Sequence, residues 1–250
     1  MRRRVLVPLP DHDFDVTEVA VPWRLLSDAG CEVIFATEAG ATPAADPLLL
    51  DGVVFGQLGA AEEAKDFYAE LAETPRFKQP LTYADIVPGA FDGLLLPGGH
   101  AKGMRQYLGS EALHAKVAQF WGLGRPVGAI CHGVLVLARS KDESGRSVIA
   151  EMRTTCLPKY MERTAFMSTV WRRGRYYRTY SAYVEDEVCD ALTNPKVQFE
   201  RGPRVLSKRG TAIDDSAAFV VQDGRYVSAR WPGDAYAFGR AFTELVTAGG

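Results

Sequence analysis

The sequence has 250 residues, of which 47% are hydrophobic and 24% are charged, and its formal net charge is −2. This length is enough for one large α/β domain or two small ones. The near-neutral charge gives no general attraction to nucleic acid or to a membrane surface, so we expect neither as a partner.

The four cysteines lie far apart and show no paired C-x-x-C spacing: Cys31, Cys131, Cys156 and Cys189. We therefore expect reduced thiols in a cytoplasmic protein, rather than a disulfide framework or a zinc site. The apolar run at residues 5–9 is too short for the core of a signal peptide. No apolar run approaches the ~18 residues of a membrane span.

The first 40 residues predict a strand, a helix and a second strand. Residues 4–9 form the first expected strand and residues 10–15 a loop. Thr17 is the expected N-cap of a helix that ends near Gly30, and residues 31–37 form the next strand. This βαβ order is typical of a parallel sheet, whose ligands bind at the carboxyl ends of the strands. Glu18, in the first turn of the helix, is expected at that edge.

Residues 40–90 interrupt the alternation with prolines and glycines around one expected helix at 60–72. We interpret this segment as a cap over the sheet edge within a single domain spanning residues 1–250, because it is too short to hold its own core. Residues 91–96 then predict another central strand, followed by the motif L-P-G-G-H at 96–100. Residues 111–121 predict an amphipathic helix.

An apolar strand at residues 127–130 runs directly into Cys131, His132 and Gly133, which are followed by a helical apolar run. A thiol at such a turn lies at a helix N-terminus, where free N–H groups favour the thiolate form. The thiolate is the nucleophile. The pattern therefore predicts a reactive Cys131; a buried structural cysteine is the alternative.

Residues 160–183 predict a second, irregular insertion. Within it, the stretch at 171–180 contains four arginines and four aromatic residues. A patch for nucleic acid or an anionic ligand is one interpretation. The net charge favours the other, a loop that covers the core or meets a second subunit. A helix at 184–192, a hairpin at 217–230 around Asp223-Gly224 and a helix at 234–246 complete the chain.

The motifs A-I-C-H-G at 129–133 and L-P-G-G-H at 96–100, together with Glu18 and residues 219–235, resemble the DJ-1/PfpI superfamily. The sequence is most similar to its Hsp31-like branch, often labelled class I glutamine amidotransferase-like. The resemblance implies a flavodoxin-like three-layer α/β sandwich with a mostly parallel sheet, a nucleophile elbow and usually a homodimer. Residues 40–90 and 171–180 match less well.

Cys131 is the expected nucleophile, and the backbone N–H groups of Gly99 and His132 are the expected oxyanion donors. No histidine follows residue 132, so the C-terminal histidine of true glutamine amidotransferases has no counterpart here. The general base is then His132 or a histidine from outside its helix. His100 and His12 are candidates to line the pocket, with surface loop positions as the alternative for both.

Glu18 is the second candidate acid–base group. A carboxyl beside Cys131 in a dry pocket is pushed toward its protonated form and can move a proton; simple charge complementarity at a helix N-terminus is the alternative. Hsp31-like relatives orient the histidine with an acid that follows a proline. Here Lys159 follows Pro158, and Glu162 fits only roughly, which leaves a complete Cys-His-acid triad open.

The leading hypothesis is a cofactor-free, metal-free cysteine enzyme acting on small reactive carbonyls, of the glyoxalase III or deglycase kind that the family includes, which converts methylglyoxal to lactate. Cys131 would attack the aldehyde, and His132 and Glu18 would move a proton between the two carbons. A cysteine amidase or peptidase of the PfpI type is the first alternative. A stress-response holdase chaperone, whose Cys131 is oxidised reversibly, is the second.

Overall fold

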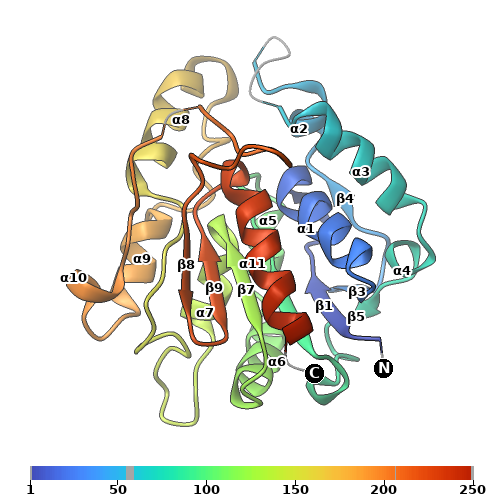
Figure 1. Cartoon of the computed structure of the whole chain (residues 1–250). Coiled ribbons are helices and arrows are strands. Elements are labelled where there is room, and N and C mark those ends of the chain that lie inside the picture. The colour runs from blue at the N-terminus through green and yellow to red at the C-terminus, as the bar shows by residue number, and fades with distance from the viewer. Residues whose placement is uncertain (1, 55–58, 206, 249–250) are drawn as a thin grey trace.

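A seven-stranded sheet forms the centre of the computed structural model, which describes residues 2–54, 59–205 and 207–248. The strand order is β5-β3-β1-β6-β7-β9-β8, and every neighbouring pair is parallel except β8 and β9 (Figure 1). The strands are β1 Arg4–Pro8, β3 Glu32–Thr37, β5 Leu81–Thr82, β6 Gly93–Leu96, β7 Val127–Ile130, β8 Val220–Asp223 and β9 Tyr226–Ala229. A separate two-stranded sheet pairs β2 His12–Phe14 with β4 Ala44–Ala45.

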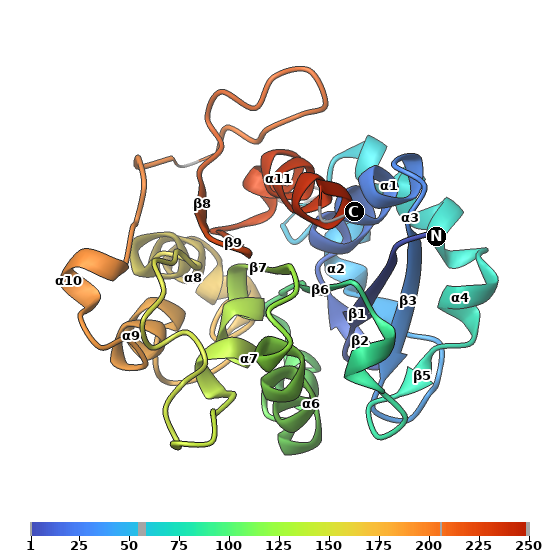
Figure 2. The same cartoon turned by 60° about the horizontal axis from the view of Figure 1, so that its bottom comes forward.

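Helices cover both faces of the central sheet (Figure 2). One face carries α1 Val16–Asp28 and α11 Ala235–Ala248, which pack against each other, and the other carries α6 Glu111–Gly122 and α7 Val134–Arg139. The strands β6 and β7 are buried along their whole length, as expected for apolar runs between two helical layers. The three-layer α/β sandwich with a mostly parallel sheet is thus confirmed. The remaining helices are α2 Pro47–Asp51, α3 Glu62–Ala72, α4 Pro75–Lys78, α5 Met104–Leu108, α8 Lys159–Arg173, α9 Val184–Asp190 and α10 Pro195–Gln198, with short 3₁₀ turns at Pro88–Ala90, Cys131–Gly133 and Pro232–Asp234.

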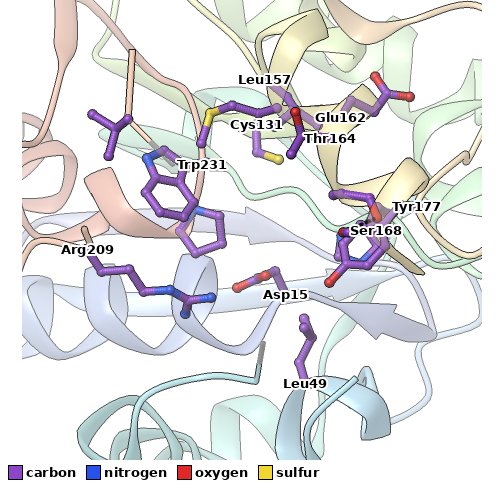
Figure 3. A pocket seen from close by; sticks show the side chains of 15 residues that line it. Asp15, Leu49, Cys131, Leu157, Glu162, Thr164, Ser168, Tyr177, Arg209 and Trp231 are labelled. Atoms are coloured by element: carbon purple, nitrogen blue, oxygen red, sulfur yellow. Dashed lines mark hydrogen bonds between the residues drawn. The ribbon is translucent and has the colours of Figure 1, made fainter. Parts of the chain in front are cut away.

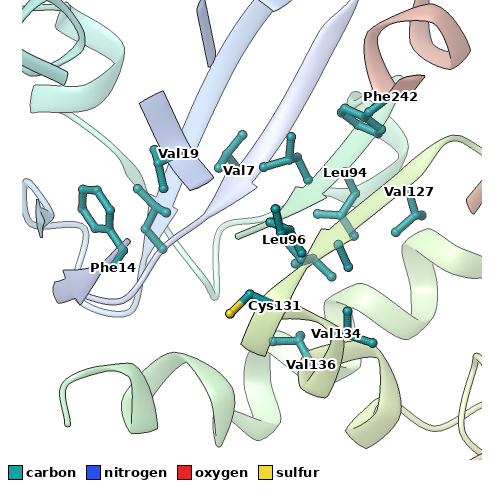
Figure 4. Packing of buried hydrophobic residues seen from close by; sticks show 14 of the residues in the cluster. Val7, Phe14, Val19, Leu94, Leu96, Val127, Cys131, Val134, Val136 and Phe242 are labelled. Atoms are coloured by element: carbon teal, nitrogen blue, oxygen red, sulfur yellow. The ribbon is translucent and has the colours of Figure 1, made fainter. Parts of the chain in front are cut away.

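The hydrophobic core joins the strands of the sheet to the helices on both faces, and Cys131 is part of it (Figure 4). Helix α11 lies so close to β7 that a Cβ on Gly128 would sit 2.9 Å from the ring of Phe242. This close packing fixes the end of β7, and with it the backbone of Cys131. None of the described helices is long and apolar enough to cross a membrane.

The start of α1 differs from the sequence-based expectation. The N-cap is Asp15, not Thr17, because the Asp15 carboxylate accepts the N–H groups of Thr17 and Glu18 at 2.8 and 3.1 Å. Residues 12–14 of the expected loop form strand β2. Glu18 still lies in the first helical turn, so its expected place at the sheet edge is unaffected.

Both segments that interrupt the expected alternation contain regular structure. Within residues 40–90, β5 joins the central sheet beside β3, and α3 packs against α1. This segment is therefore partly built into the layers and is more than a cap. Within residues 160–183, the expectation of an irregular segment is wrong for the first half, which forms α8. Its periodicity was hard to read because Met167, Val170 and Trp171 are exposed apolar residues.

Candidate active site

Cys131 occupies a tight elbow between β7 and α7. Its φ angle is +59°, a left-handed conformation that is costly for a residue with a side chain. Two glycines make the elbow possible. A Cβ on Gly133 would lie 2.1 Å from the carbonyl oxygen of Leu96, and one on Gly98 would lie 2.7 Å from the backbone nitrogen of His132. The ends of β6 and β7 therefore touch, with Cys131 held at the point of contact.

Glu18 reaches the same point from the start of α1. Its side chain is buried, and Oε2 accepts the N–H of Gly98 at 2.8 Å. A Cβ on Gly98 would be 2.8 Å from Oε2 of Glu18 and 3.0 Å from Cβ of Cys131. The Glu18 carboxyl and the Cys131 side chain therefore lie on either side of Gly98, where a side chain would contact both. Burial, followed by the charge of Asp15, raises the pKa of Glu18 well above its ordinary value.

The expectation of an easily ionised thiol is contradicted. Burial, then the nearby carboxyls of Glu18 and Asp15, raise the pKa of Cys131 well above its ordinary value, and the N–H of His132 offsets only part of this. The helix that follows is only 6 residues long. Burial and mutual repulsion act on both groups, so a negative charge on either Cys131 or Glu18 disfavours ionisation of the other.

His132 contacts the thiol through one ring nitrogen and a threonine through the other. Nδ1 lies 3.5 Å from Sγ of Cys131, and Nε2 lies 3.2 Å from Oγ1 of Thr179. The Thr179 hydroxyl donates its one hydrogen to the carbonyl of His100, at 2.6 Å. Its oxygen can therefore only accept from His132, so Nε2 carries the hydrogen of the neutral ring and Nδ1 presents a lone pair to the thiol.

The His132 ring is neutral in this setting. Burial, then the charges of His100 and Arg139, lower its pKa to about 3. An imidazolium–thiolate ion pair is therefore disfavoured, because the ring's hydrogen-bond partners among the described residues are the Cys131 thiol and the Thr179 hydroxyl and include no carboxylate. The resting site consists of uncharged hydrogen-bonding groups ordered from the thiol through His132 to Thr179.

Glu162, expected to orient His132, is placed elsewhere. Oε2 accepts the N–H of Val184, the first residue of α9, at 3.2 Å, and Oε1 lies 3.6 Å from the Arg178 guanidinium. Glu185 of α9 in turn accepts the N–H of Lys159, the first residue of α8, at 2.9 Å. The two helices therefore cap each other's N-termini. Glu162 borders the cavity described next, but Thr179 occupies the position expected for a triad acid.

A cavity of about 220 Å³ opens in front of Cys131 (Figure 3). His100 lines it as expected, with its ring stacked on Tyr177 at 4.2 Å and its pKa lowered by burial to about 3. His12 is different: it is exposed on β2, and its ring lies over Gly103, where a Cβ would approach it to 2.6 Å. The lining is formed by Asp15, Leu49, His100, Cys131, Leu157, Met161, Glu162, Thr164, Ala165, Ser168, Tyr177, Val205, Arg209, Trp231 and Pro232.

Several residues of the site were not identified as site residues from the sequence. Trp231 follows β9, a parallel neighbour of β7, so its place at the carboxyl edge was readable in principle. Asp15 carried an N-cap signal that was assigned to Thr17. Thr179 and Tyr177 lie in the arginine- and aromatic-rich stretch at 171–180, which was interpreted as a covering loop or an anionic-ligand patch and gave no sign of a contact with His132 or His100. Within residues 2–54, 59–205 and 207–248, no group of three or more His, Cys, Asp or Glu side chains is arranged to hold a metal ion.

Comparison with known proteins agrees with this architecture. A family model described as ThiJ/PfpI family-like matches residues 9–203. An uncharacterized protein of Schizosaccharomyces pombe is 26% identical over 253 residues, covering 97% of this chain and 84% of its own. The deglycase PfpI of Pyrococcus furiosus is 26% identical over 238 residues, covering 95% and 96%. Glyoxalase III from Candida albicans has the same fold, with a TM-score of 0.68 at 19% identity over 97% of each chain. The chain therefore belongs to the ThiJ/PfpI family, within the DJ-1/ThiJ/PfpI superfamily.

Proposed function

We propose that the protein is a cysteine enzyme that converts 2-oxoaldehydes such as methylglyoxal to 2-hydroxy acids without a cofactor. The observation that carries this proposal is the buried Glu18 carboxyl beside Cys131, with its pKa raised well above the ordinary value. A carbonyl isomerisation needs a second acid–base group next to the nucleophile. The names of two similar proteins, a deglycase and a glyoxalase III, support the same class of chemistry.

The reaction begins with attack of the Cys131 sulfur on the aldehyde carbon. Nδ1 of His132 takes the thiol proton and passes it to the new alkoxide, which gives a hemithioacetal. The N–H groups of His132 and Gly99 are the proposed donors to that alkoxide. Both residues follow the carboxyl ends of the adjacent parallel strands β7 and β6, which supports this proposal.

The hydrogen is then moved from the first carbon to the second. Nδ1 of His132 removes the proton from the first carbon while Glu18 protonates the oxygen on the second, which gives an enediol. Glu18 next takes back the proton of the first hydroxyl, and His132 returns its proton to the second carbon. The product is a thioester of a 2-hydroxy acid. Water hydrolyses this thioester, which restores the thiol and releases the acid.

A cysteine amidase or peptidase is the second candidate. The lone pair of His132 Nδ1 lies 3.5 Å from the thiol and could deprotonate it during attack on an amide. The neutral Thr179 partner stabilises an imidazolium less than a carboxylate would, which weakens a hydrolase that depends on His132 alone. The carbonyl reaction has Glu18 as a second acid–base group, and we favour it for that reason. We further propose a place in the Hsp31-like branch, which the motifs at 96–100 and 129–133 and residues 219–235 resemble. The histidine that directly follows the cysteine fits this branch and PfpI-like members alike.

The test is a panel assay of the wild-type protein and Cys131→Ser against methylglyoxal, a chromogenic amide and an aggregating client protein. We expect the wild type to release lactate from methylglyoxal and Cys131→Ser to release none. Amide cleavage without lactate would replace the carbonyl proposal by the amidase. Suppression of aggregation that is unchanged in Cys131→Ser, with neither reaction, would favour a holdase.

A further inference from the structure

We propose that the preferred substrates are 2-oxoaldehydes whose second substituent is an uncharged alkyl or aryl group larger than methyl. This inference rests on the proposed function and concerns the size and polarity of the cavity. Its volume of about 220 Å³ is roughly seven times the share of one water molecule in the liquid. The few heavy atoms of methylglyoxal would leave much of this space unfilled, whereas a longer substituent would occupy it.

The wall around this space is largely apolar. Leu49 of α2, Leu157 and Met161 near the start of α8, and Trp231 with Pro232 after β9 come from three separate parts of the chain and face one cavity (Figure 3). Apolar lining with a few placed polar groups is the usual composition of a small-molecule site. An apolar substituent therefore enters this cavity with the smallest desolvation cost.

The Trp231 side of the wall is held rigidly. A Cβ on Gly233 would lie 2.3 Å from the Trp231 ring, so the indole packs directly on the glycine. The turn that carries both is closed by a fully buried pair, in which Arg230 donates to both carboxylate oxygens of Asp234 at 2.8 and 2.9 Å. A wall fixed in this way selects a substituent by shape, since it cannot collapse onto a smaller one.

The charged groups of the cavity do not favour an ionic substituent. The Arg209 guanidinium and the Asp15 carboxylate point toward each other across one side of the cavity (Figure 3). Arg209 also lies against the Trp231 ring, at 5.7 Å from its centroid. A carboxylate or phosphate on the substrate would meet Asp15 as well as Arg209, and an ammonium group would meet both in the same way. The opposite charges offset each other. Burial of the substrate's apolar substituent is then the main source of selectivity among substrates.

The proposal is tested with a series of alkyl glyoxals from methyl to butyl, because lengthening an alkyl chain hardly changes the reactivity of the carbonyl groups. Each methylene that enters the cavity is expected to raise kcat/KM about fourfold. Butylglyoxal should therefore exceed methylglyoxal by at least tenfold. Equal or falling kcat/KM along the series would overturn the inference and leave the proposed function intact. If no member of the series is turned over while an amide is cleaved, the proposed function fails, and the inference fails with it.

Ala165→Leu sharpens this test, because Ala165 lines the cavity from α8 and leucine is a good helix former. The added side chain fills the space, so the ratio of butyl- to methylglyoxal kcat/KM should fall at least fivefold. Ala112→Leu is the matched control, since Ala112 is exposed on α6, and it should keep the wild-type ratio. An unchanged ratio in Ala165→Leu with wild-type thermal stability, or an equal change in Ala112→Leu, would overturn the inference.

Discussion

The elbow around Cys131 and the segment at residues 160–183 both shape the candidate site, but they do so by different means. At the elbow, the backbone itself sets the geometry: glycines permit strand ends to touch, Cys131 and His132 are adjacent in sequence, and Glu18 reaches them from the start of α1. In residues 160–183, the Thr179 hydroxyl is hydrogen-bonded to His132, which lies 47 positions earlier in the sequence. The Glu162 carboxylate accepts the N–H of Val184, the first residue of α9. Residues placed by a backbone turn or by the order of parallel strands can be predicted from the sequence, whereas a side-chain partner supplied by an irregular segment cannot.

The largest effect is expected from disturbing the elbow through Gly133→Ala. The added Cβ would lie 2.1 Å from a backbone carbonyl oxygen, which cannot move without separating the ends of β6 and β7. We expect a loss of at least about 3 kcal/mol in the free energy of unfolding, measured by urea denaturation. Gly122→Ala at the end of α6 is the control, because a Cβ there meets nothing within 4 Å. Similar stabilities for the two variants would contradict the described contact.

Glu18→Gln tests the acid–base part of the elbow. Glutamine is nearly isosteric and keeps an oxygen for the Gly98 N–H, but it cannot shuttle a proton. We expect methylglyoxal turnover to fall by at least about a hundredfold, the usual cost of losing a positioned acid–base group. Glu111→Gln, in the first turn of α6, controls for loss of a helix N-terminal charge. Near-wild-type turnover in Glu18→Gln would rule out the proposed proton transfers.

Thr179→Val tests the contribution of residues 160–183, the second of the two regions compared. Valine preserves the shape but removes the acceptor for Nε2–H of His132 and the donor to His100. Loss of a buried hydrogen-bonding partner is worth about 1–3 kcal/mol, so kcat should fall by roughly ten- to a hundredfold. Thr179→Ser retains the hydroxyl and should recover most of the rate. If both variants lose equal activity, packing of the threonine methyl matters and the hydroxyl does not.

The smallest effect is expected from Glu162→Gln and appears in the pH dependence of stability. Burial, partly offset by the N–H of Val184 and by Arg178, raises the pKa of Glu162 from 4.5 to about 7. Between these values the folded protein binds more protons than the unfolded chain, so this carboxyl lowers the free energy of unfolding as the pH rises. Relative to Glu162→Gln, the free energy of unfolding of the wild type should fall by roughly 2 kcal/mol between pH 5 and 7. A difference that stays constant with pH would show that Glu162 ionises normally.

Much of the fold could be predicted from the sequence, and the reasons are physical. Apolar runs bounded by glycine and proline located β1, β3, β6 and β7, and their parallel order predicted that Glu18, Gly99 and Cys131 would meet at one edge. In the structure the Glu18 carboxyl accepts the N–H of Gly98 at this edge. The partner of His132 could not be predicted, because a threonine at a turn has many alternative roles. The protonation of Cys131 was also misjudged. Its helix N-terminus was visible in the sequence, but the burial and the carboxyls that raise its pKa depend on tertiary packing.

The resting site is a neutral chain of hydrogen bonds, in which Thr179 fixes the His132 ring so that Nδ1 faces the thiol. Nitrogen-15 NMR of histidine-labelled protein tests this directly, since the chain has only 4 histidines. The His132 signals, assigned by their change in Thr179→Val, should show a hydrogen on Nε2 and none on Nδ1 at every pH from 5 to 8, because the pKa of the ring is about 3. A hydrogen on Nδ1, or an imidazolium at pH 7, would contradict the account.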